Sequence, residues 1–187
     1  MESSKAKLVQ YLKDAECLKF GEFTLKAGTK SNYYVDLRYV SVKRGPFKYT
    51  IDLVKETVDR IIVGSKTPVA ITGVPYGVVP LAAIIADRCD LPYYPIRKEI
   101  KDYGNKPDTT LLDDHEFVLI EDVMSSGSSV IETIQKMGNK KIIAVVVVVD
   151  RESGGKEALK NLYPNVSVHS ILSASEILGD NRSPIDN

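Results

Sequence analysis

One stretch decides the fold: FVLIEDVMSSGSSV, residues Phe117–Val130. Its first half is almost continuously apolar, which is typical of a strand buried on both faces of a parallel sheet. We therefore predict a strand over Phe117–Asp122, then a short serine-rich loop and a helix over Ser129–Met137. In an open α/β sheet, ligands bind at the carboxyl ends of the strands. The polar residues of this stretch fall at such an end, so we expect them to form a binding site.

The loop has the composition of a phosphate site. The N–H groups of Ser125–Ser129 can converge on one anion at the start of the helix, where the dipole and the unpaired donors favour negative charge. Gly127 lets the backbone approach the ligand, while Glu121 and Asp122 can accept hydrogen bonds from a vicinal diol. The pattern matches neither GxxxxGK nor GxGxxG and predicts a bound ribose 5-phosphate. An ordinary serine-capped helix is the alternative.

Strands and helices alternate on both sides of this stretch. The alternation implies an α/β fold with an open, doubly wound parallel sheet. The predicted strands are Val69–Thr72, Tyr93–Arg97, Phe117–Asp122, Ile142–Val149 and Val166–Ile171, and the predicted helices are Val78–Arg88, Ser129–Met137 and Gly155–Leu162.

The N-terminal residues follow a different pattern. Residues 5–15 indicate an amphipathic helix, and a second helix is predicted from Pro46 to about Val63. Between them, Glu22–Lys26 and Tyr33–Arg38 indicate two extended segments joined by AGTKSN. We expect one domain, 1–187, with a small N-terminal hood at about residues 1–40, a core at about 41–178 and a polar tail at 179–187.

The bulk composition excludes several classes of protein. Because 25 basic side chains balance 25 acidic ones, we expect neither a nucleic acid nor an anionic membrane as a partner. Cys17 and Cys89 form no CxxC pattern and have no histidine nearby, which argues against a zinc site and indicates a reducing compartment. The N-terminus lacks a signal-peptide core, and the longest apolar run, Ile142–Val149, is too short for a bilayer of about 30 Å. We expect a cytoplasmic protein.

Several stretches also carry a family resemblance. The segment EDVMSSGSS resembles the phosphoribosyl pyrophosphate signature of the type I phosphoribosyltransferases. Other stretches narrow the resemblance to the orotate phosphoribosyltransferases, and most of all to the first domain of eukaryotic UMP synthase. They are LKFGEFTLKAG, YYVDLR, GVPYGVVPLA, IRKEIKDYG, VVVVVDRESGG and SVHSILSASEIL, and they cover roughly Leu18 to Leu178 in the family's order.

The resemblance implies the type I phosphoribosyltransferase fold and a specific reaction. The enzyme would transfer ribose 5-phosphate from phosphoribosyl pyrophosphate to orotate, giving orotidine 5′-monophosphate and pyrophosphate in UMP biosynthesis. The donor's ribose hydroxyls and 5-phosphate are implied to contact Glu121, Asp122, Val123, Met124, Ser125, Ser126, Gly127, Ser128 and Ser129.

The resemblance also implies a loop for pyrophosphate and a pocket for orotate. By this resemblance, the loop containing Tyr76 would bind pyrophosphate through its backbone, while Gly77 replaces a lysine of many bacterial members, so no side-chain contact is expected there. Lys26 is implied to contact both substrates. The orotate pocket takes Tyr34, Val35, Ser125 and Arg151, whose guanidinium can bind the orotate anion in a planar, charge-assisted contact.

Two of these interpretations have structural alternatives. Tyr33 and Tyr34 can be aromatic strand residues that pack in the core. Arg151 can form a salt bridge to Asp150 or Glu152 instead of binding a ligand.

A long polar stretch lies between Glu99 and Asp114. Two basic residues directly precede it, and others lie within it. A connection of this length without periodicity is usually a lid or a disordered insert. Arg97, Lys98 and Lys101 can stabilise a departing diphosphate, although a solvated surface is the alternative. The resemblance implies that the arginine and the loop lysine serve the neighbouring subunit's site, so we expect a homodimer with shared sites. Tyr103 occupies a donor-binding position where bacterial members usually have histidine.

The expected mechanism is displacement at C1 of the ribose by the ring nitrogen of orotate, through a transition state with oxocarbenium character. Positioning and stabilisation of the diphosphate would supply most of the catalysis, with Lys101 and Asp122 as the catalytic residues. Mg²⁺ is the expected cofactor, held by substrate oxygens and not by a protein cage. The loop with Lys101 would close over the substrates and exclude water.

Three other functions remain open at this point. A purine phosphoribosyltransferase would share the phosphate loop but lack the matched hood and the DRESGG segment. A non-catalytic regulator would lose the loop cations and gain a basic face. A bifunctional synthase would need a decarboxylase domain, which this sequence does not encode.

Overall fold

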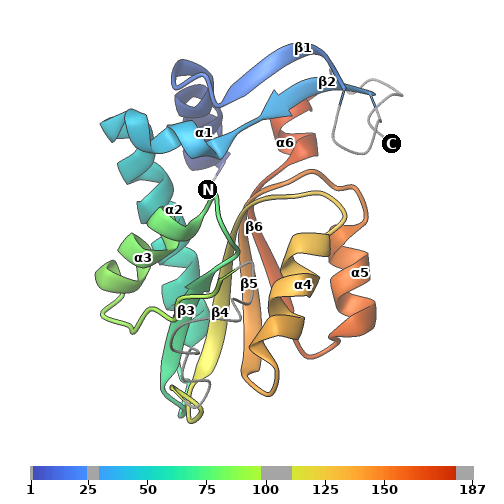
Figure 1. Cartoon of the computed structure of the whole chain (residues 1–187). Helices are drawn as coiled ribbons and strands as arrows, with labels where there is room; N and C mark the ends of the chain where they lie inside the picture. The colour runs from blue at the N-terminus through green and yellow to red at the C-terminus, as the bar shows by residue number, and fades with distance from the viewer. Residues whose placement is uncertain (1, 25–29, 98–110, 180–187) are drawn as a thin grey trace.

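In a computed structural model of the chain, the structure is described for residues 2–24, 30–97 and 111–179 (Figure 1). Most of the polar stretch between Glu99 and Asp114, and the predicted tail from residue 180 onward, lie outside these ranges. The elements are α1 Glu2–Asp14, β1 Leu18–Thr24, β2 Lys30–Val35, η1 Leu37–Val42, α2 Arg44–Ile62, β3 Val69–Gly73, α3 Val79–Arg88, β4 Glu116–Met124, α4 Ser128–Met137, β5 Lys141–Asp150, α5 Gly155–Leu162, β6 Ser167–Ser173 and α6 Ala174–Leu178.

The main sheet contains parallel strands in the order β3-β4-β5-β6. Helices α2 and α3 cover one face, and α4 and α5 cover the other (Figure 1). Because both faces are covered, all of β3 and residues Ala144–Asp150 of β5 are buried. The continuous apolar runs therefore belong to strands inside a parallel sheet, and the predicted α/β fold is confirmed.

The sheet is doubly wound because the direction in which strands are added to it reverses after β3. Tyr93 forms a parallel bridge with Ile71 on the edge of β3 that faces away from β4. The chain thus moves to one side through α3 and then returns to add β4, β5 and β6 on the other side. The carboxyl ends of β3 and β4 lie at this switch point, where ligands of doubly wound sheets bind.

The predicted strand Tyr93–Arg97 is wrong, because only Tyr93 takes part in a bridge. The carbonyl of Tyr94 accepts a hydrogen bond from the Thr72 hydroxyl at 2.7 Å. The ladder would continue through this carbonyl, because Ile71 already bonds the Pro92 carbonyl and the Tyr94 N–H on this edge of β3. The pairing therefore stops after one bridge.

The hood is a separate antiparallel hairpin, β1–β2, above the carboxyl ends of the main sheet (Figure 1). Its existence is confirmed, but its strands are shifted. The second strand ends at Val35 and not at Arg38, because the Asp36 side chain accepts a hydrogen bond from the Arg38 N–H at 3.1 Å and caps η1. The first strand begins at Leu18, before the predicted start at Glu22.

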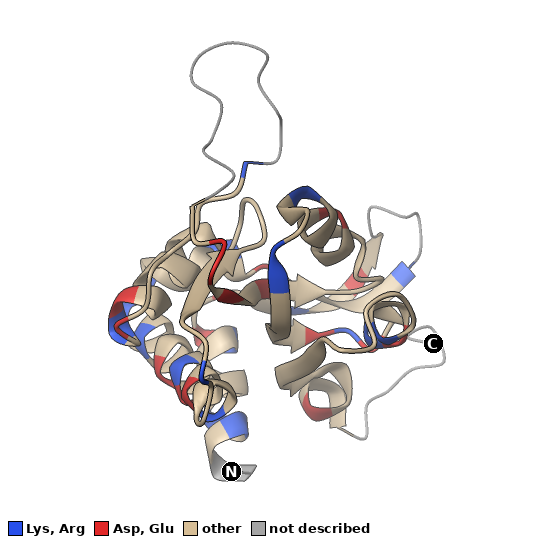
Figure 2. Cartoon of the chain, turned by 90° about the horizontal axis from the view of Figure 1, so that it is seen from below, with Lys and Arg blue, Asp and Glu red and all other residues tan. Residues whose placement is uncertain are grey.

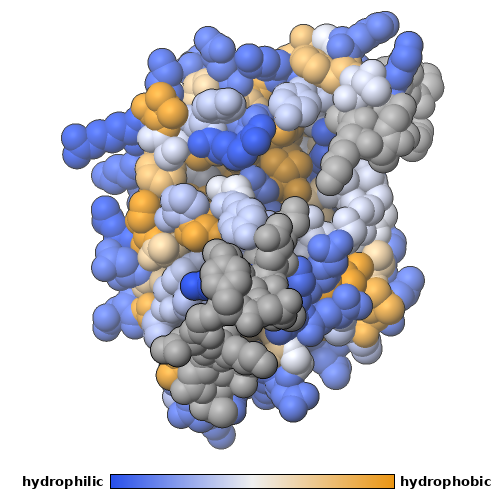
Figure 3. Space-filling model, in the orientation of Figure 1, coloured by the Kyte–Doolittle hydropathy of each residue, from blue (hydrophilic) through white to orange (hydrophobic). Residues whose placement is uncertain are grey.

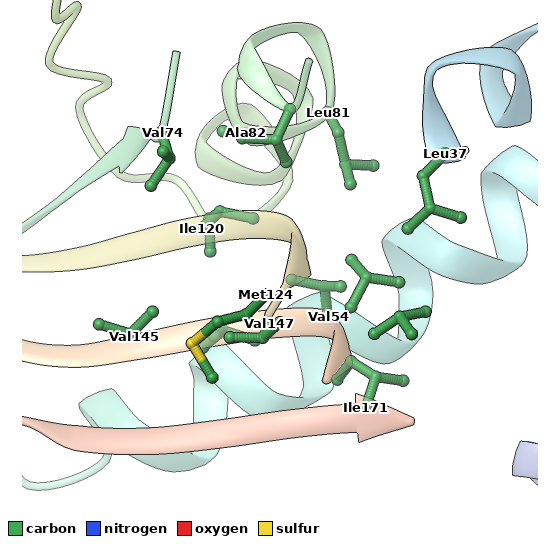
Figure 4. Close-up of a cluster of buried hydrophobic side chains, with 14 of the residues drawn as sticks. Leu37, Val54, Val74, Leu81, Ala82, Ile120, Met124, Val145, Val147 and Ile171 are labelled. Carbon is green, nitrogen blue, oxygen red and sulfur yellow. The ribbon is translucent and has the colours of Figure 1, made fainter. Parts of the chain in front are cut away.

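The core lies on both faces of the sheet, and Figure 4 shows part of it, between the sheet and α2 and α3 and near the end of β4. Met124, the last residue of β4, is almost fully buried there, so the loop that follows starts from a packed position. Gly73 at the end of β3 leaves no room for a side chain, because a Cβ there would lie 2.9 Å from the Ala82 Cβ of α3. Within the described residues, no helix is long and apolar enough to cross a bilayer.

Candidate active site

The site forms where the loops after β3 and β4 meet. The Val74 N–H donates to the Ile120 carbonyl at 2.9 Å, which ties the two strand ends together. A Cβ at Gly77 would lie 2.7 Å from the Asp122 Oδ2 atom. The backbone beside Tyr76 therefore passes in contact with the Asp122 carboxylate, and the two predicted segments are neighbours.

The phosphate loop, Ser125–Ser129, surrounds a hollow of about 150 Å³. Gly127 adopts φ 78° and ψ 2°, a left-handed conformation that costs little only for glycine, and it is the N-cap of α4. No side chain of the described residues caps this helix, so the serine-capped alternative is wrong. The first N–H groups of α4 are left for another acceptor. The hollow is lined by Glu121, Val123, Met124, Ser125, Ser126, Gly127, Ser128 and Ser129.

The start of α5 supports this loop from behind. A Cβ on Gly155 would lie 2.5 Å from the Ser125 carbonyl oxygen and 3.0 Å from the Gly127 nitrogen. Just before it, the Arg151 N–H donates to the Met124 carbonyl at 2.8 Å. Sequence reasoning missed Gly155. The pair GG at the start of a helix, in the segment RESGG, was the available signal.

The two carboxylates differ in environment. Glu121 is 5 % exposed and accepts a hydrogen bond from the Asp122 N–H at 3.0 Å. Burial, and then the charge of Asp122, raise the pKa of Glu121 well above the usual 4.5. Asp122 is half-buried and accepts a hydrogen bond from the Val123 N–H at 2.8 Å. The raised pKa favours the neutral form of Glu121 and so reduces repulsion between the pair and a bound phosphate.

Arg151 follows β5 and reaches under the hood. Its Nη2 donates to the Ser31 hydroxyl at 2.9 Å, and its guanidinium carbon lies 4.5 Å from the centroid of the Tyr33 ring. The side chain is only 9 % exposed. The alternative of a salt bridge to Asp150 or Glu152 is wrong, because no carboxylate of the described residues pairs with Arg151.

The hood residues divide between two faces of β2. Ser31, Tyr33 and Val35 are buried, whereas Tyr34 is 36 % exposed and lies against Phe23 at 5.5 Å between ring centroids. Core packing thus holds for Tyr33. Sequence reasoning missed Ser31, although the alternation of β2 places it on the same face as Tyr33. Figure 3 shows apolar surface beneath the hood.

The remaining predicted residues are placed only in part. Arg97 is exposed at the end of the described segment. Lys26, Lys98, Lys101 and Tyr103 lie outside the described residues. Figure 2 shows acidic and basic residues interspersed along the helices, in keeping with the balanced charge of the whole chain. Any strong attraction for an anion must therefore come from locally placed groups, such as the N–H donors of the phosphate loop.

The comparisons with known proteins point in one direction. The family model described as "Phosphoribosyl transferase domain" matches residues 49–173. Uridine 5′-monophosphate synthase of Bos taurus is 37 % identical over 182 residues, which cover 91 % of this chain and 35 % of that protein. The chain thus spans about a third of the bovine synthase. Orotate phosphoribosyltransferase of Methanocaldococcus jannaschii is 34 % identical over 177 residues, covering 90 % of this chain and 97 % of that protein.

A solved structure agrees with these relatives. The crystal structure of orotate phosphoribosyltransferase from Aeropyrum pernix superposes with a TM-score of 0.77 at 26 % identity. The match covers 93 % of this chain and 97 % of that one.

Proposed function

We propose specific roles for the residues of this chain, which belongs to the orotate phosphoribosyltransferase family. Members of this family are glycosyltransferases of pyrimidine biosynthesis. The reaction transfers ribose 5-phosphate from phosphoribosyl pyrophosphate to orotate, giving orotidine 5′-monophosphate and pyrophosphate. In the proposal, the hood and the core act together as one domain.

One observation carries the assignment of roles: Arg151 touches both halves of the site. Its N–H donates to the Met124 carbonyl, at the root of the phosphate loop, while its guanidinium lies against the hood at Ser31 and Tyr33. A buried guanidinium without a carboxylate partner is costly unless an anion binds it. The orotate carboxylate is such an anion, and its planar shape suits a bidentate contact. The hood would therefore bind the base beside a donor held by the phosphate loop.

The donor is assigned to the other half of the site. Its 5-phosphate binds in the hollow at Ser125–Ser129, because the uncapped start of α4 offers N–H donors to an anion. Glu121 and Asp122 accept hydrogen bonds from the ribose hydroxyls. The pyrophosphate contacts the backbone at Tyr76, which runs past Asp122.

The chemical step exchanges one bond at C1 of the ribose for another. The ring nitrogen of orotate first gives up its proton to water and then forms a bond to C1, while the bond from C1 to the diphosphate oxygen breaks and its electron pair leaves with the diphosphate. Arg97, Lys98 and Lys101 stabilise the charge that develops on this leaving group. Asp122 holds the ribose and stabilises the positive character at C1.

The residues present fit a magnesium ion that arrives with the donor. Among the described residues, no group of three or more histidine, cysteine, aspartate or glutamate side chains gathers to form a metal cage. Mg²⁺ usually takes few protein ligands and keeps substrate and water oxygens. Glu121 and Asp122 are the carboxylates beside the proposed ribose. Bound there, the ion would neutralise charge on the diphosphate.

We also propose a cytoplasmic homodimer with shared active sites. Tyr39 and Val42 of η1 are large apolar side chains exposed to solvent. A hollow of about 340 Å³ between α2 and α3 is lined in part by Phe47, Ile51 and Ile84. Apolar surface of this kind is typical of contacts between proteins. Light scattering on the purified chain should give twice the monomer mass.

The direct experiment is a spectroscopic assay of the purified chain. Orotate's near-ultraviolet absorbance should fall when the chain, magnesium and phosphoribosyl pyrophosphate are mixed. Adenine and hypoxanthine in place of orotate should give no product. Consumption of a purine base, or an unchanged orotate signal, would reject the proposed function.

A further inference from the structure

We propose that Ser31 and Tyr33 are positioning residues, which fix the guanidinium of Arg151 without neutralising its charge, so that the charge is kept for an anionic substrate. The inference rests on the proposed function and deepens it. It assigns the discrimination between a pyrimidine carboxylate and a neutral pyrimidine to two uncharged hood residues.

The hood holds the guanidinium from two sides. Ser31 accepts a hydrogen bond from Arg151 Nη2 at 2.9 Å, and the Tyr33 ring faces the guanidinium carbon at 4.5 Å. An aromatic face attracts a cation through its quadrupole and carries no net charge. The two contacts fix both the position and the plane of the guanidinium.

Ser31 is itself held in place. Its hydroxyl donates to the Tyr33 carbonyl at 2.8 Å and accepts from the Tyr33 N–H at 3.3 Å. Both residues are almost fully buried, at 3 % and 1 % exposure. A hydroxyl fixed by the backbone cannot rotate freely, so it offers Arg151 an acceptor in one direction.

The neighbouring carboxylates are engaged elsewhere. Asp150 lies 3.1 Å from the Lys156 ammonium and accepts from the Glu152 N–H at 2.9 Å. Glu152 accepts from the Ser175 N–H and hydroxyl, on α6. Neither of these two acids forms an ion pair with Arg151 among the described residues.

This arrangement has a chemical consequence. A carboxylate partner would occupy the planar fork of the guanidinium, whereas one hydroxyl and one ring face leave further N–H groups for a ligand. A planar pyrimidine acid can take those donors through its carboxylate. Uracil has the same ring without the carboxylate, so it cannot use them.

The test measures the KM values of orotate and phosphoribosyl pyrophosphate separately in the full chain. Ser31→Ala should raise the orotate KM about tenfold, as expected for loss of one hydrogen bond to a charged group. The donor KM should stay at the wild-type value. Ser31→Thr keeps the hydroxyl and should restore most of the orotate affinity. Ser65→Ala, an exposed serine before β3, is the matched control and should change neither constant.

Further variants test whether residue 31 must be uncharged and whether the aromatic ring of Tyr33 is needed. Ser31→Asp should raise the orotate KM more than Ser31→Ala does, because the new carboxylate would form an ion pair with Arg151 and take the N–H groups that orotate needs. Tyr33→Phe should keep the preference for orotate over uracil, and Tyr33→Leu should lower it. An orotate KM for Ser31→Asp at or below that of Ser31→Ala would overturn the claim that neutrality matters.

The remaining outcomes separate the inference from the proposed function. Equal rises in both KM values of Ser31→Ala, or no change in either, would overturn the positioning role. If the wild-type chain binds orotate in calorimetry but does not consume it, the proposed function fails. The orotate affinities of the wild-type and Ser31→Ala chains then decide the inference without turnover.

Discussion

The phosphate loop and the hood contact with Arg151 lie on the same edge of the sheet but are built in opposite ways. The loop is made of backbone, and its shape depends on atoms that are missing: Gly127 has a left-handed φ, and Gly155 leaves space for the Ser125 carbonyl. The hood contact is made of side chains, and it depends on atoms that are present, a hydroxyl and a ring. Added atoms should therefore damage the first region, and removed atoms should damage the second.

Gly155→Ala should have the largest effect. Its Cβ would lie 2.5 Å from the Ser125 carbonyl oxygen, so the phosphate loop must move. We expect kcat/KM for phosphoribosyl pyrophosphate to fall about 100-fold, as for loss of one well-placed donor. Chemical unfolding should show a loss of about 1–3 kcal/mol from overpacking. Gly45→Ala is the control, because nothing lies within 4 Å of its Cβ position, and wild-type kinetics in Gly155→Ala would contradict the backbone view of the loop.

Lys101→Ala changes a residue that belongs to neither the phosphate loop nor the hood contact. The side chain is assigned to the departing diphosphate, so its loss should lower kcat by about two orders of magnitude. Donor binding should persist, because the 5-phosphate contacts do not involve this residue. Steady-state kinetics with both substrates measure the split, and unchanged turnover would remove Lys101 from its assigned role.

Glu121→Gln tests the electrostatics of the phosphate region through stability. Burial, then Asp122, raise the pKa of Glu121 above 4.5, so the folded chain holds this proton more tightly than the unfolded chain. The resulting stabilisation is present below pH 4.5 and is lost as the pH rises through the raised pKa. Glutamine stays neutral and keeps an acceptor for the Asp122 N–H. We expect the free energy of unfolding of the variant to fall less with pH than that of the wild type.

Urea unfolding across a pH series that starts at about 4 provides this comparison. Depressed pKa values, such as those of Asp36 and Glu176, act with the opposite sign and are common to both proteins. The difference between the two curves therefore isolates Glu121. Parallel curves would show that this carboxyl does not bind its proton more tightly on folding.

Ser126→Ala should have the smallest effect. Its hydroxyl is exposed and donates only to the Ser128 hydroxyl, at 3.3 Å, among the contacts of the described residues. If N–H groups hold the phosphate, the loss should change the donor KM by about twofold, which corresponds to roughly 0.5 kcal/mol. A tenfold rise would mean that serine side chains, and not the backbone, bind the donor.

The elements that the sequence predicts correctly are those with a strong local pattern. Continuous apolar runs identify β4 and β5, because burial on both faces of a parallel sheet leaves a local signal. The predicted strand at Tyr93–Arg97 was wrong because the Thr72 hydroxyl bonds the Tyr94 carbonyl that the ladder would use next. The predicted end of β2 was wrong because the Asp36 side chain caps η1 and so ends the strand at Val35. The pattern of hydropathy carries little information about such competing hydrogen bonds between neighbouring polar groups.

In the site, local segments were predictable and long-range contacts were not. The phosphate loop is contiguous, so its serines and glycine stand together in the sequence. Ser31 and Arg151 are separated by 120 residues, and alternation along β2 says which face Ser31 shares but not what lies opposite. Gly155 was missed for the same reason, because its neighbour Ser125 belongs to another strand–helix unit.

Calorimetric titration with ribose 5-phosphate tests the division between the two regions most directly. Wild type and Ser31→Ala should bind it with equal affinity, and Gly155→Ala should bind it at least about tenfold more weakly, a difference of roughly 1.4 kcal/mol. Absence of binding to the wild type, or equal binding by Gly155→Ala, would contradict the claim that the loop after β4 holds the sugar phosphate.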